Sequence, residues 1–94
     1  MAVINWTHRS VNDLKNIAEF IEKDSVKYAS LTIQRLMNAA HLLEENPRIG
    51  RKVPEAGQKD KIREIIQGNY RIIYQIANED LINILTVHHS SRKL

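Results

Sequence analysis

The chain has 94 residues, 43% of them hydrophobic, and no cysteine. These values are typical of one small folded domain, 1–94, and exclude an intrinsically disordered chain, a disulfide-stabilised scaffold and a thiolate metal site. No apolar stretch reaches the ~20 residues of a membrane span, and the first residues lack the pattern of a signal peptide, so we expect a soluble cytoplasmic protein with no membrane partner.

The N-terminal half predicts a strand followed by a helix. Residues 3–6 are a short run of β-formers and predict the strand. Thr7 and Ser10 are both suitable N-caps for the helix. Its apolar residues recur every three or four positions and predict one buried face, made of Val11, Leu14, Ile17, Ala18 and Ile21.

A second helix follows after a very short link. Ser25 is a good N-cap for it, and Asn46-Pro47 ends it because the residue before proline avoids the α region. The buried face is predicted to contain Ala29, Ile33, Leu36, Ala40 and Leu43. Two amphipathic helices with so short a link indicate an antiparallel hairpin.

The C-terminal half predicts a loop and three strands. Residues 46–61 hold both prolines and two of the three glycines and indicate a connecting loop. Runs rich in β-branched residues predict strands at 62–66, 70–76 and 81–88. Short turns between them imply antiparallel pairing. We therefore expect an α+β fold of order β-α-α-β-β-β, with the hairpin covering one side of a four-stranded, mainly antiparallel sheet and Arg71 on the uncovered side.

Positive charge is concentrated in the second half. The net charge is +3, but residues 47–94 contain nine Lys or Arg against five Asp or Glu, whereas residues 1–46 contain five against six. The positive charge of residues 47–94 suits a polyanionic partner such as RNA, DNA or an acidic protein segment. Selection for solubility alone would give the same composition.

Several short motifs, taken together in order, resemble the RelE/ParE superfamily of bacterial toxins. The first motifs are Trp6-Thr7, Asp13-Leu14, Ile17 and Ile21, and the loop motifs are Asn46-Pro47, Gly50-Arg51 and Val53-Pro54-Glu55. The remaining motifs are Arg63-Glu64, Gly68, Tyr70 to Tyr74, Val87, His89 and Arg92. The resemblance implies two helices packed on a small twisted sheet, and a type II toxin–antitoxin (plasmid stabilisation) system in which a cognate antitoxin neutralises the toxin.

The resemblance also implies one of two bacterial targets. ParE-like members inhibit growth by binding DNA gyrase, whereas RelE-like members enter the ribosome and cut mRNA by attack of a ribose 2′-OH on the adjacent phosphate. For the RNA-cutting activity the matching catalytic residues are Arg71, His89 and Glu55. The predicted strand before that of Arg71 contains only one cation, Arg63, and no aromatic residue follows Tyr74. The set of residues expected of an RNA-cutting member is therefore incomplete, which favours the ParE-like function.

Arg71 and Glu55 also have structural alternatives, and one or both histidines could be only polar residues at a fraying strand end. Arg71 could form an ion pair with Glu64 or Glu55, and Glu55 could pair with Arg51 or Arg63. Strand alternation places either His88 or His89 on the face of Arg71: an odd sum of paired residue numbers selects His88 and an even sum selects His89. The turn leaves both pairings open, and the resemblance favours His89.

Two further groups of residues are candidates for binding. The cations that could contact nucleic acid or another target are Arg51, Lys52, Lys61, Arg63 and Arg92. The second group lies off the main apolar stripe of the second helix and contains Tyr28, Leu31 and Met37. These residues could contact the antitoxin or simply pack in the core. Four histidines without clustered carboxylates predict no metal site, and no cofactor is expected.

Overall fold

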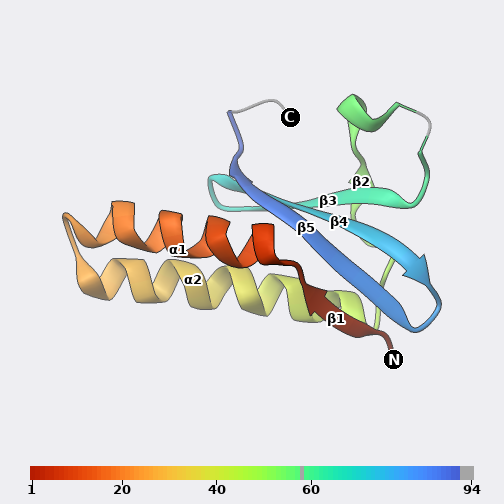
Figure 1. Cartoon of the computed structure of the whole chain (residues 1–94), viewed down its shortest axis with the longest axis horizontal. Coiled ribbons are helices and arrows are strands. Elements are labelled where there is room, and N and C mark those ends of the chain that lie inside the picture. The colour runs from red at the N-terminus through yellow and green to blue at the C-terminus, as the bar shows by residue number, and fades with distance from the viewer. Residues whose placement is uncertain (58, 92–94) are drawn as a thin grey trace.

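The computed structural model describes residues 1–57 and 59–91, which form a helical hairpin packed on a twisted sheet (Figure 1). The elements are β1 (Val3–Trp6), α1 (His8–Glu22), α2 (Val26–His41), β2 (Arg51–Lys52), β3 (Ile62–Gln67), β4 (Tyr70–Asn78) and β5 (Leu81–His89). The strand order is β1-β5-β4-β3-β2, with β1 parallel to β5 and the other pairs antiparallel. The predicted α+β class with a mainly antiparallel sheet is confirmed.

The loop between α2 and β3 contains more structure than expected. It includes two short 3-10 turns, η1 (Leu42–Glu44) and η2 (Pro54–Ala56), and the fifth strand β2. In β2, Arg51 pairs with Glu64 and Lys52 with Arg63. The sequence did not indicate this strand because two charged residues have no β-pattern, and the pairing depends on a partner strand that follows later in the chain.

Both helices begin at the predicted caps. The amide of Ser10 donates to Thr7 Oγ1 at 3.2 Å, and the amide of Tyr28 donates to Ser25 Oγ at 3.0 Å. The expected place of Val11 on the buried face was wrong, since it is 44% exposed while Ser10 is fully buried. Ser10 can occupy that position because its hydroxyl donates to the Thr7 carbonyl at 2.8 Å, so no polar group is left unsatisfied.

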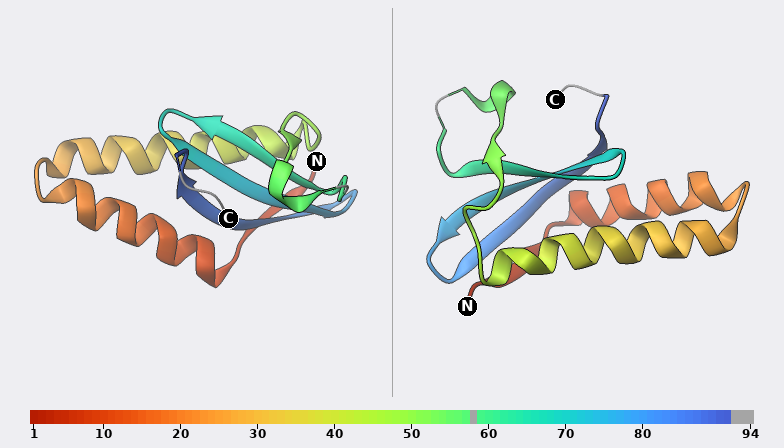
Figure 2. Two further views of the ribbon diagram at one scale, coloured as in Figure 1. Left: turned by 90° about the horizontal axis from the view of Figure 1, so that it is seen from above. Right: turned by 180° about the vertical axis from the view of Figure 1, so that it is seen from behind.

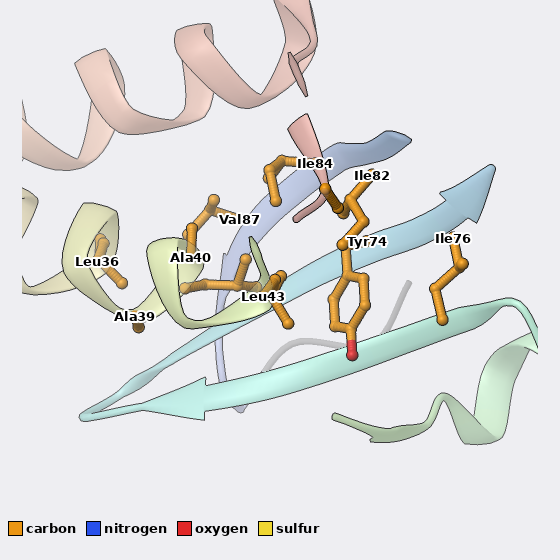
Figure 3. Close-up of a cluster of buried hydrophobic side chains, with 11 residues drawn as sticks. Leu36, Ala39, Ala40, Leu43, Tyr74, Ile76, Ile82, Ile84 and Val87 are labelled. Atoms are coloured by element: carbon orange, nitrogen blue, oxygen red, sulfur yellow. The ribbon is translucent and has the colours of Figure 1, made fainter. Parts of the chain in front are cut away.

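The core lies between α2 and the helix-facing side of the sheet (Figure 3). Ala39 and Ala40 let the helix approach the strands closely, and Leu36 and Leu43 extend toward them. On the strands, the buried residues of this face are Ile72, Tyr74, Ile76, Ile82, Ile84 and Val87. Full burial of each large apolar side chain contributes about 1.5–3 kcal/mol. The far end of the hairpin extends past the sheet (Figure 1 and Figure 2).

Tyr74 joins the core to the loop that precedes β2. Its hydroxyl donates to the Pro47 carbonyl at 2.7 Å and accepts from the Gly50 amide at 3.0 Å. Burial is the main reason that the pKa of Tyr74 is raised above its usual value. A Cβ at position 50 would lie 2.5 Å from the Tyr74 Oη and 2.6 Å from the Glu64 carbonyl oxygen, so only glycine fits between them.

Candidate functional site

Arg71 lies on the face of the sheet opposite the helices, as predicted. Ile72 and Tyr74 of the same strand point into the core on the side of the helices. Because side chains alternate between the two faces of a strand, Arg71 points to the other face. The expectation that this side is open around Arg71 was wrong, because the side chain is only 7% exposed. The η2 turn covers it from the loop, through Glu55.

Two carboxylates bind the Arg71 guanidinium. Nε donates to Glu64 Oε1 at 2.7 Å, while Nη1 and Nη2 donate to the two oxygens of Glu55 at 3.0 and 2.9 Å. Hydrogen bonding to Glu55, and then to Glu64, raises the pKa of Arg71 against the effect of burial. The fork-to-fork contact with Glu55 is the strongest geometry available to this pair of groups.

The second oxygen of Glu64 extends this arrangement to a fourth residue. Arg51 Nε donates to Glu64 Oε2, and the Arg51 side chain is 66% exposed. Arg51, Glu64, Arg71 and Glu55 therefore alternate in charge, and we call them the charge chain. It joins β2, β3, β4 and η2, and its formal charges cancel.

The charge chain resolves the alternatives that the sequence left open for these residues. Arg71 pairs with both candidate acids rather than with one of them. Glu55 pairs with Arg71, not with Arg51 or Arg63. The Glu64 side chain is fully buried, whereas that of Glu55 is 26% exposed. An anion that approached Arg71 would therefore have to displace Glu55.

The register of β4 and β5 decides which histidine shares the face of Arg71. At the turn Asn78 pairs with Leu81, an odd sum. A register shift in β4 makes the next sums even, a bulge in β5 restores the odd sum, and Arg71 therefore pairs with His88. His89 instead pairs with Tyr70, and the two rings are 5.7 Å apart, edge to face. The expectation that His89 lies with Arg71 was wrong, because the two shifts cancel and return the pairing to the odd sum set at the turn.

Asp13 fixes the segment that follows this bulge, a role that the sequence reasoning missed. Its Oδ2 accepts from Thr86 Oγ1 at 2.6 Å and from the Val87 amide at 2.9 Å. Thr86 Oγ1 also lies 3.3 Å from His88 Nε2. The available signal was a single acid close to the apolar stripe of the first helix. Its partners could not be named, since they are more than 70 residues away.

Apart from Arg51, the basic candidates do not gather around Arg71. Arg63 donates to the Gly50 carbonyl at 2.9 Å and to Asp60 at 3.0 Å. Lys52 Nζ lies 3.5 Å from the same carboxylate. Lys61 lines an open hollow of about 700 Å³ between the loop and the β4–β5 turn. Arg92 lies outside the described residues.

Comparison with known proteins identifies the family. Residues 4–94 match the model of the ParE toxin of the type II toxin–antitoxin system parDE. The chain belongs to the ParE toxin family. The protein named toxin Y4kP of Sinorhizobium fredii is 33% identical over 92 residues, with 96% of this chain and 90% of the relative covered.

Two further comparisons agree with the family. Toxin RelE2 of Caulobacter vibrioides is 32% identical over 93 residues, with 98% of this chain and 99% of the relative covered. A structure of the chromosomal ParDE toxin–antitoxin system from P. aeruginosa has a TM-score of 0.76 at 16% identity, with 95% of this chain and 96% of that chain covered. That structure shows the fold alone. The protein is therefore the toxin of a ParDE-like type II system, and its family implies a cognate antitoxin.

The residues predicted to contact the antitoxin are exposed on α2 of the ParE-family toxin. Tyr28, Leu31 and Met37 are 53%, 42% and 38% exposed, so they do not pack in the core. Tyr28 also borders a small hollow between α2 and the β3–β4 turn, together with Tyr70. Other exposed apolar residues that sequence reasoning did not select are Phe20, Val26, Leu42, Ile49 and Ile66.

The toxin offers no metal-binding cluster in the part of the chain that the structure describes. No group of three or more His, Asp or Glu side chains is arranged to hold an ion there. Nor do the described helices include one with the length and apolar character to cross a membrane.

Proposed function

We propose that this ParE-family toxin inhibits growth by binding DNA gyrase in the bacterial cytoplasm, without cutting RNA. The single observation that carries this proposal is the neutralisation of Arg71 by Glu64 and Glu55. The gyrase target itself follows from the ParE-like resemblance of the sequence. A cognate antitoxin is proposed to cover the exposed apolar surface of α2.

The neutralised arginine argues against the RNA-cutting alternative. Attack of a 2′-OH builds negative charge on the phosphate, and an arginine that lowers this barrier must have donors aimed at it. Each of the three donor nitrogens of Arg71 already donates to a carboxylate. Glu55 is bound to the same guanidinium, and His89 lies beside Tyr70 on the other face. The three candidate catalytic groups therefore do not converge on one reacting centre.

A supercoiling assay tests the gyrase proposal directly. Purified toxin is titrated into gyrase with relaxed plasmid and ATP, and we expect supercoiling to fall with toxin concentration. Addition of the cognate antitoxin should restore it, which separates specific inhibition from loss of gyrase. Full supercoiling at a large excess of folded toxin would refute the proposal.

One observation favours the alternative, a ribosome-dependent mRNA endonuclease. His88 lies directly opposite Arg71, so displacement of Glu55 would place a cation and an imidazole side by side. Glu55→Gln would weaken the contact that occludes Arg71. If the toxin is a nuclease, this variant should cut ribosome-bound mRNA at least as fast as the native chain, and Arg71→Lys should cut it more slowly. We expect neither protein to cut, as measured by primer extension on programmed ribosomes.

A further inference from the structure

The loop between α2 and β3 carries cations that the charge chain does not use. Asp60 lies at their centre: Arg48 Nη1 is 3.1 Å from its Oδ2, and Arg63 Nη2 and Lys52 Nζ are 3.0 and 3.5 Å from its Oδ1. Lys59 and Lys61 flank it in the chain. We call this group the basic corner, and its members are Arg48, Lys52, Lys59, Asp60, Lys61 and Arg63. It lies at the β2–β3 end of the molecule, away from the hairpin tip (Figure 1).

The basic corner accounts for the net positive charge of the protein. It holds five of the fourteen Lys and Arg residues and one of the eleven Asp and Glu residues. The nine cations elsewhere are outnumbered by ten acids, so the rest of the chain is slightly negative. The hollow of about 700 Å³ that Lys61 lines also borders the corner, and Glu79 is the one acid among its lining residues. Since the charge chain cancels internally, the positive field of this toxin originates at the corner and not at Arg71.

Four of the five cations of the corner are exposed, and three of the five bind Asp60. The side chains of Arg48 and Lys52 are 59% and 65% exposed. The side chain of Arg63 is 14% exposed and donates a hydrogen bond to the Gly50 carbonyl, which fixes its position. Arg63 also binds Asp60, and Asp60 binds Arg48 and Lys52. Arg48 and Lys61 also line the rim of the 700 Å³ hollow, which is open to solvent. Hydrogen bonding to Arg48, with the nearby charges of Arg63 and Lys52, lowers the pKa of Asp60, as a positive field requires.

We propose that the basic corner binds the phosphate backbone of duplex DNA. Its cations are spread over a loop and a strand edge and do not converge on one pocket, which suits a polyanion with repeated charges better than a single carboxylate. A single-stranded nucleic acid would need aromatic side chains on which bases stack, and residues 46–63 contain no Phe, Tyr or Trp. The choice of DNA over duplex RNA rests on the proposed gyrase target, whose substrate is duplex DNA.

Fluorescence anisotropy with a labelled DNA duplex of ~20 base pairs measures this binding on the full-length chain without gyrase. With four exposed cations, log K should fall with log salt at a slope of about −3 to −4. The test variant is Lys52→Glu with Lys61→Glu, and the control is Lys15→Glu with Lys27→Glu. The control residues are exposed on the helices and the net charge is the same. We expect the test variant to bind at least about tenfold more weakly at ~50 mM salt, and the control to lose less than about threefold.

Each other result overturns the proposal. Equal losses in the two variants would mean that only net charge matters. Tighter binding to single-stranded RNA or to a poly-glutamate peptide than to the DNA duplex would assign the corner to another partner. If the charge reversals fail to fold by circular dichroism, Lys52→Ala with Lys61→Ala serves as the test pair against Lys15→Ala with Lys27→Ala.

The supercoiling assay separates this inference from the proposed function. If the toxin binds DNA through the basic corner but does not inhibit gyrase, the proposed DNA-binding surface is supported and the proposed gyrase target is refuted. Inhibition of gyrase by a toxin that does not bind the duplex would keep the target and remove the surface. If both hold, the corner variant should also inhibit gyrase more weakly than the control variant.

Discussion

The fully buried carboxylate of Glu64 lies 2.7 Å from Nε of Arg71 and forms an ion pair within the sheet. Because Arg51 binds the other oxygen, Glu64 connects three neighbouring strands through side chains as well as backbone. Arg71 therefore has a structural role in the toxin, because carboxylates of the same chain neutralise its charge.

Loss of Glu64 should therefore destabilise the toxin strongly. Glu64→Ala leaves the buried guanidinium of Arg71 with only Glu55, and we expect the free energy of unfolding to fall by about 3–5 kcal/mol. Urea denaturation followed by circular dichroism measures this loss. The matched control is Glu79→Ala, an exposed acid, which should change stability by less than about 0.5 kcal/mol. A loss below 1 kcal/mol for Glu64→Ala would show that the pair contributes little.

Asp13 should be needed both for stability and for the position of His88. Asp13→Asn keeps one acceptor oxygen but loses the charge, and Asp13→Ala removes both hydrogen bonds to β5. We expect losses of about 1 and 2–3 kcal/mol, because bonds to a charged acceptor contribute more than neutral ones. The amide resonances of Thr86 and Val87 in NMR spectra should shift most, with those of the hairpin tip unchanged. Uniform shifts would contradict a local role.

Gly50 should not tolerate a side chain. In Gly50→Ala the new Cβ meets the Tyr74 hydroxyl and the Glu64 carbonyl, and we expect a loss of about 1–3 kcal/mol in thermal or urea unfolding. Gly57→Ala is the comparison, because its φ of +65° strains any other residue while nothing lies within 4 Å of the added atom. Tyr74→Phe in the Gly50→Ala background should recover part of the loss. No recovery would place the clash at the Glu64 carbonyl or at the ring carbon Cε1 of residue 74, which would lie 2.8 Å from the added Cβ.

Asp60 should make the loop sensitive to acid. Its pKa is lowered in the folded state, mainly by Arg48, from an ordinary value of 3.8. A lowered pKa means that the folded state binds the proton less readily, so the stabilisation is complete above pH 3.8 and is lost as the pH falls through the lowered value. Asp60→Asn should therefore flatten the fall of the melting temperature below pH 4. An unchanged acid profile would mean that the contacts of Asp60 are too exposed to contribute.

Periodicity and caps predicted the elements well, because they depend on neighbours in the chain. Thr7 and Ser25 start the two helices, and the stripe containing Leu36 and Leu43 packs on the sheet as its spacing indicated. The α+β order and the ParE-family resemblance could be recognised on the same grounds. Strand β2 could not, since two residues form a strand only because β3 lies beside them.

The site depended on contacts that linear spacing does not contain. The sequence named Arg71, Glu55, Glu64 and both histidines, and it placed Arg71 opposite the helices. Folding then brought two acids from different segments onto one guanidinium, and two compensating register shifts between β4 and β5 placed His88, not His89, opposite Arg71. Local pattern specifies how each segment is built and which side chains it offers. The cancellation of charges follows from distances of about 3 Å between segments, which exist only after the sheet has formed.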